Sequence, residues 1–89
     1  MVRGKTKSGF EFAIPEDVFD DFELVELFAA TNKDQTLIGE LTEKFLGKEQ
    51  KKELMEHVRR DGKVRMSDML IALEEIEDAI HETTTALKN

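Results

Sequence analysis

The stretch Leu46–Met66, LGKEQKKELMEHVRRDGKVRM, decides the fold, because it holds a basic helix between two turn glycines, Gly47 and Gly62. Residues 15–32 before it carry six acidic side chains and no Lys or Arg, and residues 66–82 after it carry six more, again without a basic residue. Residues 44–65 between them hold eight Lys or Arg against four Asp or Glu. This sorting of charge is typical of a small helical protein whose helices pair by charge, with one another or with a partner.

The length of 89 residues predicts a single domain, 1–89, which buries only about 60–65% of its unfolded surface, so association is an easy route to extra stability. The absence of cysteine excludes a disulfide framework and a thiolate metal site. No apolar run approaches the ~20 residues of a membrane span, and MVRGKTKSG lacks the apolar region of a secretory signal. The net charge of −7 argues against nucleic-acid binding. We therefore expect a soluble cytosolic protein with neither a membrane nor a nucleic acid as partner.

Residues 2–14 predict a β-hairpin. Lys5-Thr6-Lys7 and the run from Phe10 to Ile14 flank Ser8-Gly9, which we interpret as a two-residue turn that tolerates positive φ. The apolar residues of the second strand alternate with Glu11 and Ala13, so one face of the strand is apolar. Because a lone hairpin is marginal in water, this face should lie on the helices.

The first predicted helix follows Pro15 and begins with a capping-box pattern, Asp20 with Glu23 three residues later, while Phe19 and Leu24 take the positions of a hydrophobic staple. Its predicted buried stripe contains Phe22, Val25 and Phe28, with Leu24 beside them. Residues 31–35 are predicted to form a loop.

Two short helices should follow. The first, about residues 36–46, buries Leu37, Leu41 and Phe45, and Gly47 ends it in a left-handed conformation. The next, about residues 48–60, has a thin apolar face, and Asp61-Gly62 closes it. That face consists of Leu54, Met55 and Val58.

The closing helix has the clearest pattern. Met69, Leu73, Ile76 and Ile80 follow a 4-3-4 step, which is a seam of the coiled-coil kind. Either the seam packs on this protein's own hairpin and first helix, or it is shared with another subunit or a partner. Acidic residues stack at i, i+4 beside it, at a cost of roughly 0.2–0.5 kcal/mol per like-charge pair that a basic surface would offset. The predicted partner-binding residues are therefore Met69, Leu73, Ile76 and Ile80, with Glu74 and Asp78 at the margin.

The predicted fold class is thus mainly α: a short N-terminal β-hairpin followed by about four helices in a small bundle. The hairpin occupies residues 2–14, the bundle about residues 16–82, and residues 83–89 form a frayed tail. The seam and the small size also predict weak homo-oligomerisation.

Residues with reaction chemistry are few. His57 lies on a charged helix face and His81 beside Ile80, which favours solvated surface positions for both, and no phosphate loop or Ser-His-Asp set is present. Residues 57–68 resemble an EF-hand loop only in part, because His57 and Arg59 fall where Ca²⁺ needs oxygen ligands. We therefore expect no enzyme, and no catalytic, cofactor-binding or metal-binding residues.

Two longer strings carry a family resemblance, SGFEFAIPEDVFDDFELVELF (residues 8–28) and LGKEQKKELMEHVRRDGKV (residues 46–64). With the closing helix they cover most of the chain, which resembles the tail assembly chaperones of long-tailed bacteriophages and prophages of Gram-positive bacteria. The loop at residues 31–35 and the Thr-rich tail after Glu82 depart from the family pattern.

The resemblance implies a function in virion morphogenesis. Such chaperones coat the helical, aggregation-prone tape measure protein in the host cytoplasm before the tail tube polymerises, and they are absent from the mature virion. An extended form often recruits tail tube protein as a further partner. The rival interpretation is a small acidic helical regulator or DNA mimic that binds a basic host protein, a contact that salt should abolish.

Overall fold

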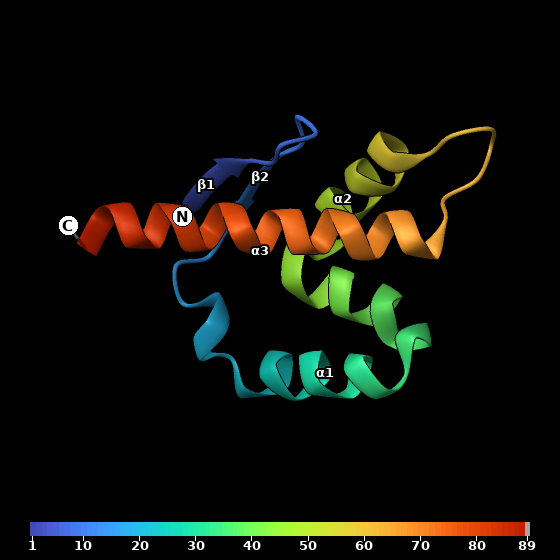
Figure 1. Cartoon of the computed structure of the whole chain (residues 1–89). Coiled ribbons are helices and arrows are strands. Elements are labelled where there is room, and N and C mark those ends of the chain that lie inside the picture. The colour runs from blue at the N-terminus through green and yellow to red at the C-terminus, as the bar shows by residue number, and fades with distance from the viewer. Residues whose placement is uncertain (89) are drawn as a thin grey trace.

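A computed structural model describes the backbone of residues 1–88 and the side chains of residues 1–82 (Figure 1). Within that part, the chain is mostly helical with an N-terminal antiparallel hairpin, as predicted, and it has three α-helices where the sequence predicted about four. The elements are β1 (Val2–Lys5), β2 (Glu11–Ile14), α1 (Phe22–Lys33), α2 (Ile38–Val58) and α3 (Met66–Lys88), with short 3₁₀ turns at Val18–Asp20 and Gln35–Leu37.

The helix count differs because α2 spans both predicted middle helices. Gly47 interrupts it with φ 84° and ψ 165°, so the glycine separates two helical segments as predicted, and the two segments are the arms of one bent helix. Figure 1 shows the two arms of α2 running at an angle to each other, with α3 across them. Gln50 closes the bend, because its side-chain amide donates to the carbonyl oxygen of Leu46 at 2.7 Å.

The hairpin pairs Val2 with Ile14 and Lys5 with Glu11, and its turn is longer than predicted. The loop is Lys7-Ser8-Gly9, with Gly9 at φ 93°, and Thr6 closes it by accepting from the N–H of Gly9 at 2.9 Å. A three-residue loop with a left-handed glycine matches the strand twist as well as a two-residue turn does. The predicted two-residue turn Ser8-Gly9 was therefore wrong.

The start and end of α1 also differ from the prediction. Asp21, and not Asp20, caps the helix, and its carboxylate accepts from the backbone N–H groups of Glu23 and Leu24 at 3.0 and 3.3 Å. Asp20 instead belongs to the preceding 3₁₀ turn. The helix then runs to Lys33, so residues 31–33 of the loop predicted at 31–35 are helical. Thr31 is buried, and its hydroxyl donates to the carbonyl oxygen of Leu27.

The core lies between the hairpin, α2 and α3, with α1 closing it from below in the view of Figure 1. The alternating face of the hairpin is buried as predicted: Phe10, Phe12 and Ile14. Gln50 also ties the hairpin to α2, since it donates to Ala13 O and accepts from Ala13 N–H, both at 2.7 Å. No helix in the described part of the chain is both long enough and apolar enough to cross a membrane.

The seam of α3 is part of this core. Ile76 is fully buried, and Met69, Leu73 and Ile80 are buried beside it. The helix packs against α2 and β1, so the seam covers the chain's own hairpin and middle helix, whereas the prediction had named the hairpin and the first helix. The predicted frayed tail, 83–89, lies outside the residues whose side chains are described.

Replacing Ile76 by Asp should unfold the domain. The side chain has 0% exposure, and burying an unpaired charge there costs several kcal/mol, comparable with the ~5 kcal/mol that stabilises a small domain. Ile71→Asp is the matched control on the same helix, because Ile71 is 54% exposed and surface changes usually cost less than about 1 kcal/mol. Circular dichroism and urea unfolding measure both; a folded Ile76→Asp protein would contradict the internal seam.

The two glycines of α2 should respond oppositely to alanine. Gly47→Ala should destabilise the domain by about 1–3 kcal/mol, because its φ and ψ are accessible almost only to glycine. Gly39→Ala should stabilise it by up to about 1 kcal/mol, since Gly39 is helical and an added Cβ would meet only Lys51 Nζ at 3.8 Å. Thermal unfolding of the two variants tests this, and a neutral Gly47→Ala would show that the bend is not imposed by the backbone at that residue.

Candidate functional site

The predicted partner-binding residues fall into two groups in the structure. Met69, Ile76 and Ile80 are buried in the core, so a partner or a second subunit would reach them only if α3 separated from the hairpin and α2. Leu73 is buried as well, but it also lines a groove between α1 and α3. Glu74 and Asp78 are exposed, as expected for residues at the margin of the seam. The partner-binding role of the four apolar residues stays a prediction, and the surface of the folded domain offers a different apolar face.

That face lies on α1 and consists of Phe22, Val25 and Ala29, which we call the outer stripe. Phe22 is 72% exposed, Val25 is 47% exposed, and Ala29 is exposed as well. Their spacing of i, i+3 and i+7 places them along one side of the helix.

The sequence prediction had buried Phe22 and Val25, and here it was wrong. Steps of three residues, as in 22, 25 and 28, drift around a helix of 3.6 residues per turn. The face that packs on the core is instead the one that mixes steps of three and four, namely Leu24, Leu27, Phe28 and Thr31.

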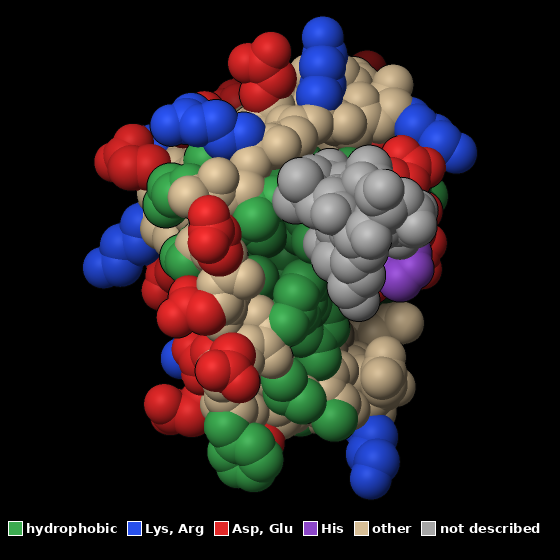
Figure 2. Space-filling model, turned by 90° about the vertical axis from the view of Figure 1, so that its left-hand side faces the viewer, with side chains coloured by type: hydrophobic (Ala, Val, Ile, Leu, Met, Phe, Trp, Pro, Cys, Tyr) green, Lys and Arg blue, Asp and Glu red, His purple; other side chains and the backbone are tan. Residues whose placement is uncertain are grey.

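Three aromatic rings fix the start of α1 on the first arm of α2. Phe19 packs on Phe28 and on Phe45 with ring centroids 6.2 and 5.7 Å apart, and Phe28 meets Phe45 at 5.8 Å. Phe19 is nevertheless 47% exposed, so the predicted staple residue extends the apolar surface around the beginning of α1. Figure 2 views this end of the molecule and shows apolar side chains in a continuous band, with acidic side chains along one edge.

A groove of about 160 Å³ runs beside the outer stripe, between α1, the start of α2 and α3. Phe28, Leu41, Leu70 and Leu73 form its apolar walls together with Ile38, and Glu74 and Glu77 of α3 also line it, with Thr31 and Asn32 of α1. We call it the α1–α3 groove. Its volume suffices for one or two apolar side chains of a partner, and the carboxylates of Glu74 and Glu77 lie beside its apolar walls.

Glu77 is the residue of this groove whose ionisation is perturbed. Partial burial raises its pKa above the ordinary value of 4.5, and the neighbouring charges of Asp78 and Glu74 raise it further. On the other flank of α1, Glu23 and Glu26 line a shallow hollow with Lys44, whose ammonium lies 3.6 Å from Asp21. The apolar surface of α1 therefore has carboxylates on both sides.

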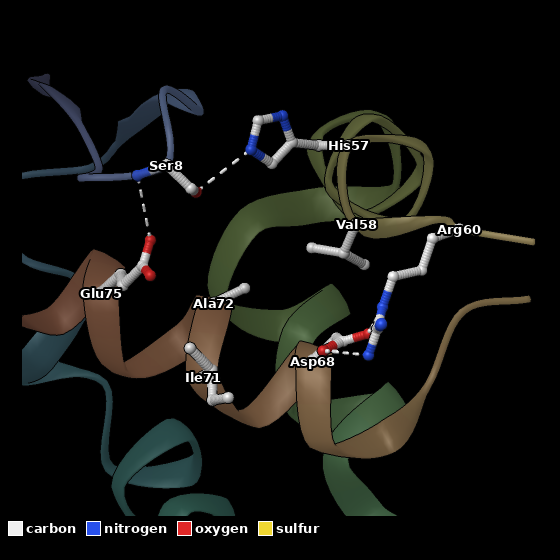
Figure 3. A pocket seen from close by; sticks show the side chains of 8 residues that line it. All are labelled: Ser8, His57, Val58, Arg60, Asp68, Ile71, Ala72 and Glu75. Atoms are coloured by element: carbon white, nitrogen blue, oxygen red, sulfur yellow. Dashed lines mark hydrogen bonds and ion pairs between the residues drawn. The ribbon is translucent and has the colours of Figure 1, made fainter.

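A second hollow, of about 220 Å³, lies between the hairpin turn, the end of α2 and α3 (Figure 3). Ser8 Oγ and His57 Nε2 are hydrogen-bonded at 3.1 Å, a contact that the sequence did not reveal because 49 positions separate the two residues. The Glu75 carboxylate accepts from the backbone N–H of Ser8 at 3.3 Å, so it fixes the turn and does not orient the imidazole.

His57 is exposed, as predicted, and its ring also packs on Phe10 at 5.5 Å. At the other end of the hollow, Arg60 donates to Asp68 at 2.9 Å, which joins the end of α2 to α3. These contacts hold the hairpin turn, the end of α2 and α3 together, and we therefore interpret the residues around the hollow as structural. Among the described residues, no group of three or more His, Asp or Glu side chains is arranged to hold a metal ion.

Comparisons with protein-family models, with curated proteins and with solved structures give no match for this chain. The function is therefore inferred from the surface of the domain and from the sequence pattern.

Removing the charge of Glu77 should stabilise the domain at neutral pH. Because its folded-state pKa is raised, the folded protein holds the proton more tightly than the unfolded chain does, and stability falls as the pH rises from about 4.5 through the folded-state pKa. Glu77→Gln should gain about 0.2–0.5 kcal/mol at pH 7 by removing like-charge repulsion. This gain should shrink as the pH falls below the ordinary Glu pKa.

Urea unfolding of Glu77→Gln at pH 7 and pH 4 measures the effect. Glu53→Gln, at an exposed position of the second arm of α2, removes the same formal charge elsewhere and serves as control. An equal, pH-independent change in both variants would mean that net charge, and not the surroundings of Glu77, sets the difference.

Proposed function

We propose that this protein is a phage tail assembly chaperone that binds and coats the tape measure protein during tail morphogenesis. One line of support comes from the sequence and one from the surface of the folded domain. The sequence strings at residues 8–28 and 46–64 resemble that family, and the folded domain exposes an apolar stripe on α1 that its own core leaves uncovered.

The exposure of Phe22 is the observation that carries the proposal. A small domain gains little from placing a phenylalanine at 72% exposure next to an exposed Val25, and adjoining exposed apolar residues are typical of interaction sites. A tape measure protein presents long apolar helical stripes of the kind that such a surface can cover. In this proposal, many copies bind along one partner chain in the host cytoplasm.

The net charge of −7 has a role in the same scheme. Each bound copy would add negative charge to the complex, and like charge keeps large assemblies dispersed. The copies would leave before the virion is complete, and an extended form would recruit tail tube protein, as the family resemblance implies.

The acidic regulator or DNA mimic remains the second candidate, and the exposed carboxylates of α1 and α3 favour it. In that case Glu23, Glu26, Glu74 and Asp78 would contact the basic site of one folded host protein. Such a complex has a fixed stoichiometry and strong salt dependence, and Phe22 need not contribute to it.

Co-expression with a tape measure protein from the same phage tests the proposal. We expect a larger soluble fraction of the tape measure protein, and pull-down of many copies of the chaperone per partner chain. The Ile76→Asp variant is a control for folding, since an unfolded domain should give no protection.

A tape measure protein that stays equally insoluble and does not co-purify would overturn the chaperone proposal. Capture instead of a single folded basic protein at a fixed ratio, released by about 0.5 M salt at which exposed charges are strongly screened, would establish the regulator.

A further inference from the structure

The outer stripe and the α1–α3 groove form one continuous surface. Both lie on α1: Asn32 and Phe28 line the groove, while Val25 and Ala29 lie on the neighbouring side of the same helix. Glu74 and Glu77 of α3 border the groove, and Glu23 and Glu26 border the opposite side of α1. The surface is thus an apolar track along a helix with acidic side chains on each flank, and on the Glu23 side the ammonium of Lys44 is already paired with Asp21.

A second copy of this chain does not offer a matching element among its described residues. Its Lys and Arg side chains are spread over the hairpin, α1, both arms of α2 and the loop after it, and the second arm of α2, which carries Lys48, Lys51 and Lys52, has its apolar face turned to the core: Leu54 is buried and Met55 and Val58 are half-buried. Helix α3 exposes Ile71 but has no Lys or Arg between residues 66 and 82. No described helix combines an exposed apolar stripe with basic flanks, which favours a helix of another protein as the occupant.

We propose that this surface binds an amphipathic helix of the tape measure protein, and that the apolar stripe of this helix has Lys or Arg on both sides. The proposal rests on the chaperone function proposed above and specifies its partner. An apolar side chain of that helix would enter the α1–α3 groove over Phe28 and Leu73, and its neighbours would cover Phe22 and Val25. Its cations would lie against Glu74 and Glu77 on one flank and Glu23 and Glu26 on the other.

The acidic flanks define the class of partner. Carboxylates beside an apolar track repel the phosphates of nucleic acids and of anionic lipids, but they attract the ammonium and guanidinium groups of a basic helix. Partial burial and the charges of Asp78 and Glu74 raise the pKa of Glu77, and a cation placed beside this carboxylate would favour its ionised form. In helix-in-groove recognition the inserting helix carries its apolar anchors at i, i+3, i+4 and i+7, which is the pattern we expect in the partner helix.

A synthetic peptide isolates this recognition from the full partner. The probe is a helical peptide of roughly 20 residues with a leucine stripe flanked by lysines, long enough to be helical in water; its control carries glutamates in place of the lysines. Fluorescence anisotropy gives the affinity, and NMR shifts of the Val25 and Ala29 methyl groups locate the contact. We expect binding of the lysine peptide only, with the largest shifts on α1.

Variants then separate the apolar and acidic parts. Phe22→Ser and Val25→Ser should each weaken peptide binding at least about tenfold, because central apolar anchors carry most of an interface energy. Ile71→Ser, at an exposed apolar position outside the track, should leave it unchanged. Glu74→Gln with Glu77→Gln should weaken binding severalfold and reduce its salt dependence, whereas Glu49→Gln with Glu53→Gln on α2 should not.

The same variants in the co-expression experiment distinguish the two proposals. If wild type keeps the tape measure protein soluble and Phe22→Ser, still folded, loses this activity, both proposals stand. If Phe22→Ser protects as well as wild type does, the assignment to α1 is wrong while the chaperone function survives. If wild type fails to protect, the chaperone proposal fails, and the inferred tape measure helix fails with it whatever the peptide does.

Discussion

At Gly47 the backbone of α2 leaves the helical path at φ 84°, and the two arms on either side of it contact different parts of the molecule. The first arm brings Phe45 to the aromatic rings of α1, and the second arm brings Gln50 to the hairpin. One left-handed glycine therefore sets where α1, the hairpin and α3 can lie, and the position of the outer stripe follows from it.

Much of this arrangement could be predicted from the sequence, because it depends on local patterns. The alternation of Phe10, Phe12 and Ile14 predicted the buried face of the hairpin, and the 4-3-4 step predicted the buried side of α3. Gly47 was predicted to end one helix, with the next helix starting at residue 48, but local pattern did not reveal how the two segments are joined across the bend. Whether a glycine ends a helix or bends it depends on what the following residues contact, and Gln50 bonds to Ala13, 37 positions away in the chain.

The candidate site could not be predicted for a related reason. Phe22 and Val25 are of residue types that usually lie in a core. Only the orientation of α1 against α2 and α3 decides that Leu24 and Phe28 face the core instead. One signal was present in the sequence: α1 carries apolar residues on more than one side, which is more than so small a domain can bury. Glu74 was placed correctly at a margin, since acidic residues beside a buried seam have to face solvent, but the groove between α1 and α3 depends on tertiary packing.

The bonds between Gln50 and Ala13 also bear on whether the hairpin can pair with other strands. An open edge of a two-stranded sheet normally templates the addition of further strands, which leads to aggregation. Here the N–H and C=O of Ala13 are both occupied by one side-chain amide, in the middle of the four-residue strand β2. An extended segment of another chain would therefore find that edge blocked at its centre, because the amide of Gln50 takes the place of a third strand. If the protein is the chaperone that we propose, the hairpin itself would then favour helical over extended partners.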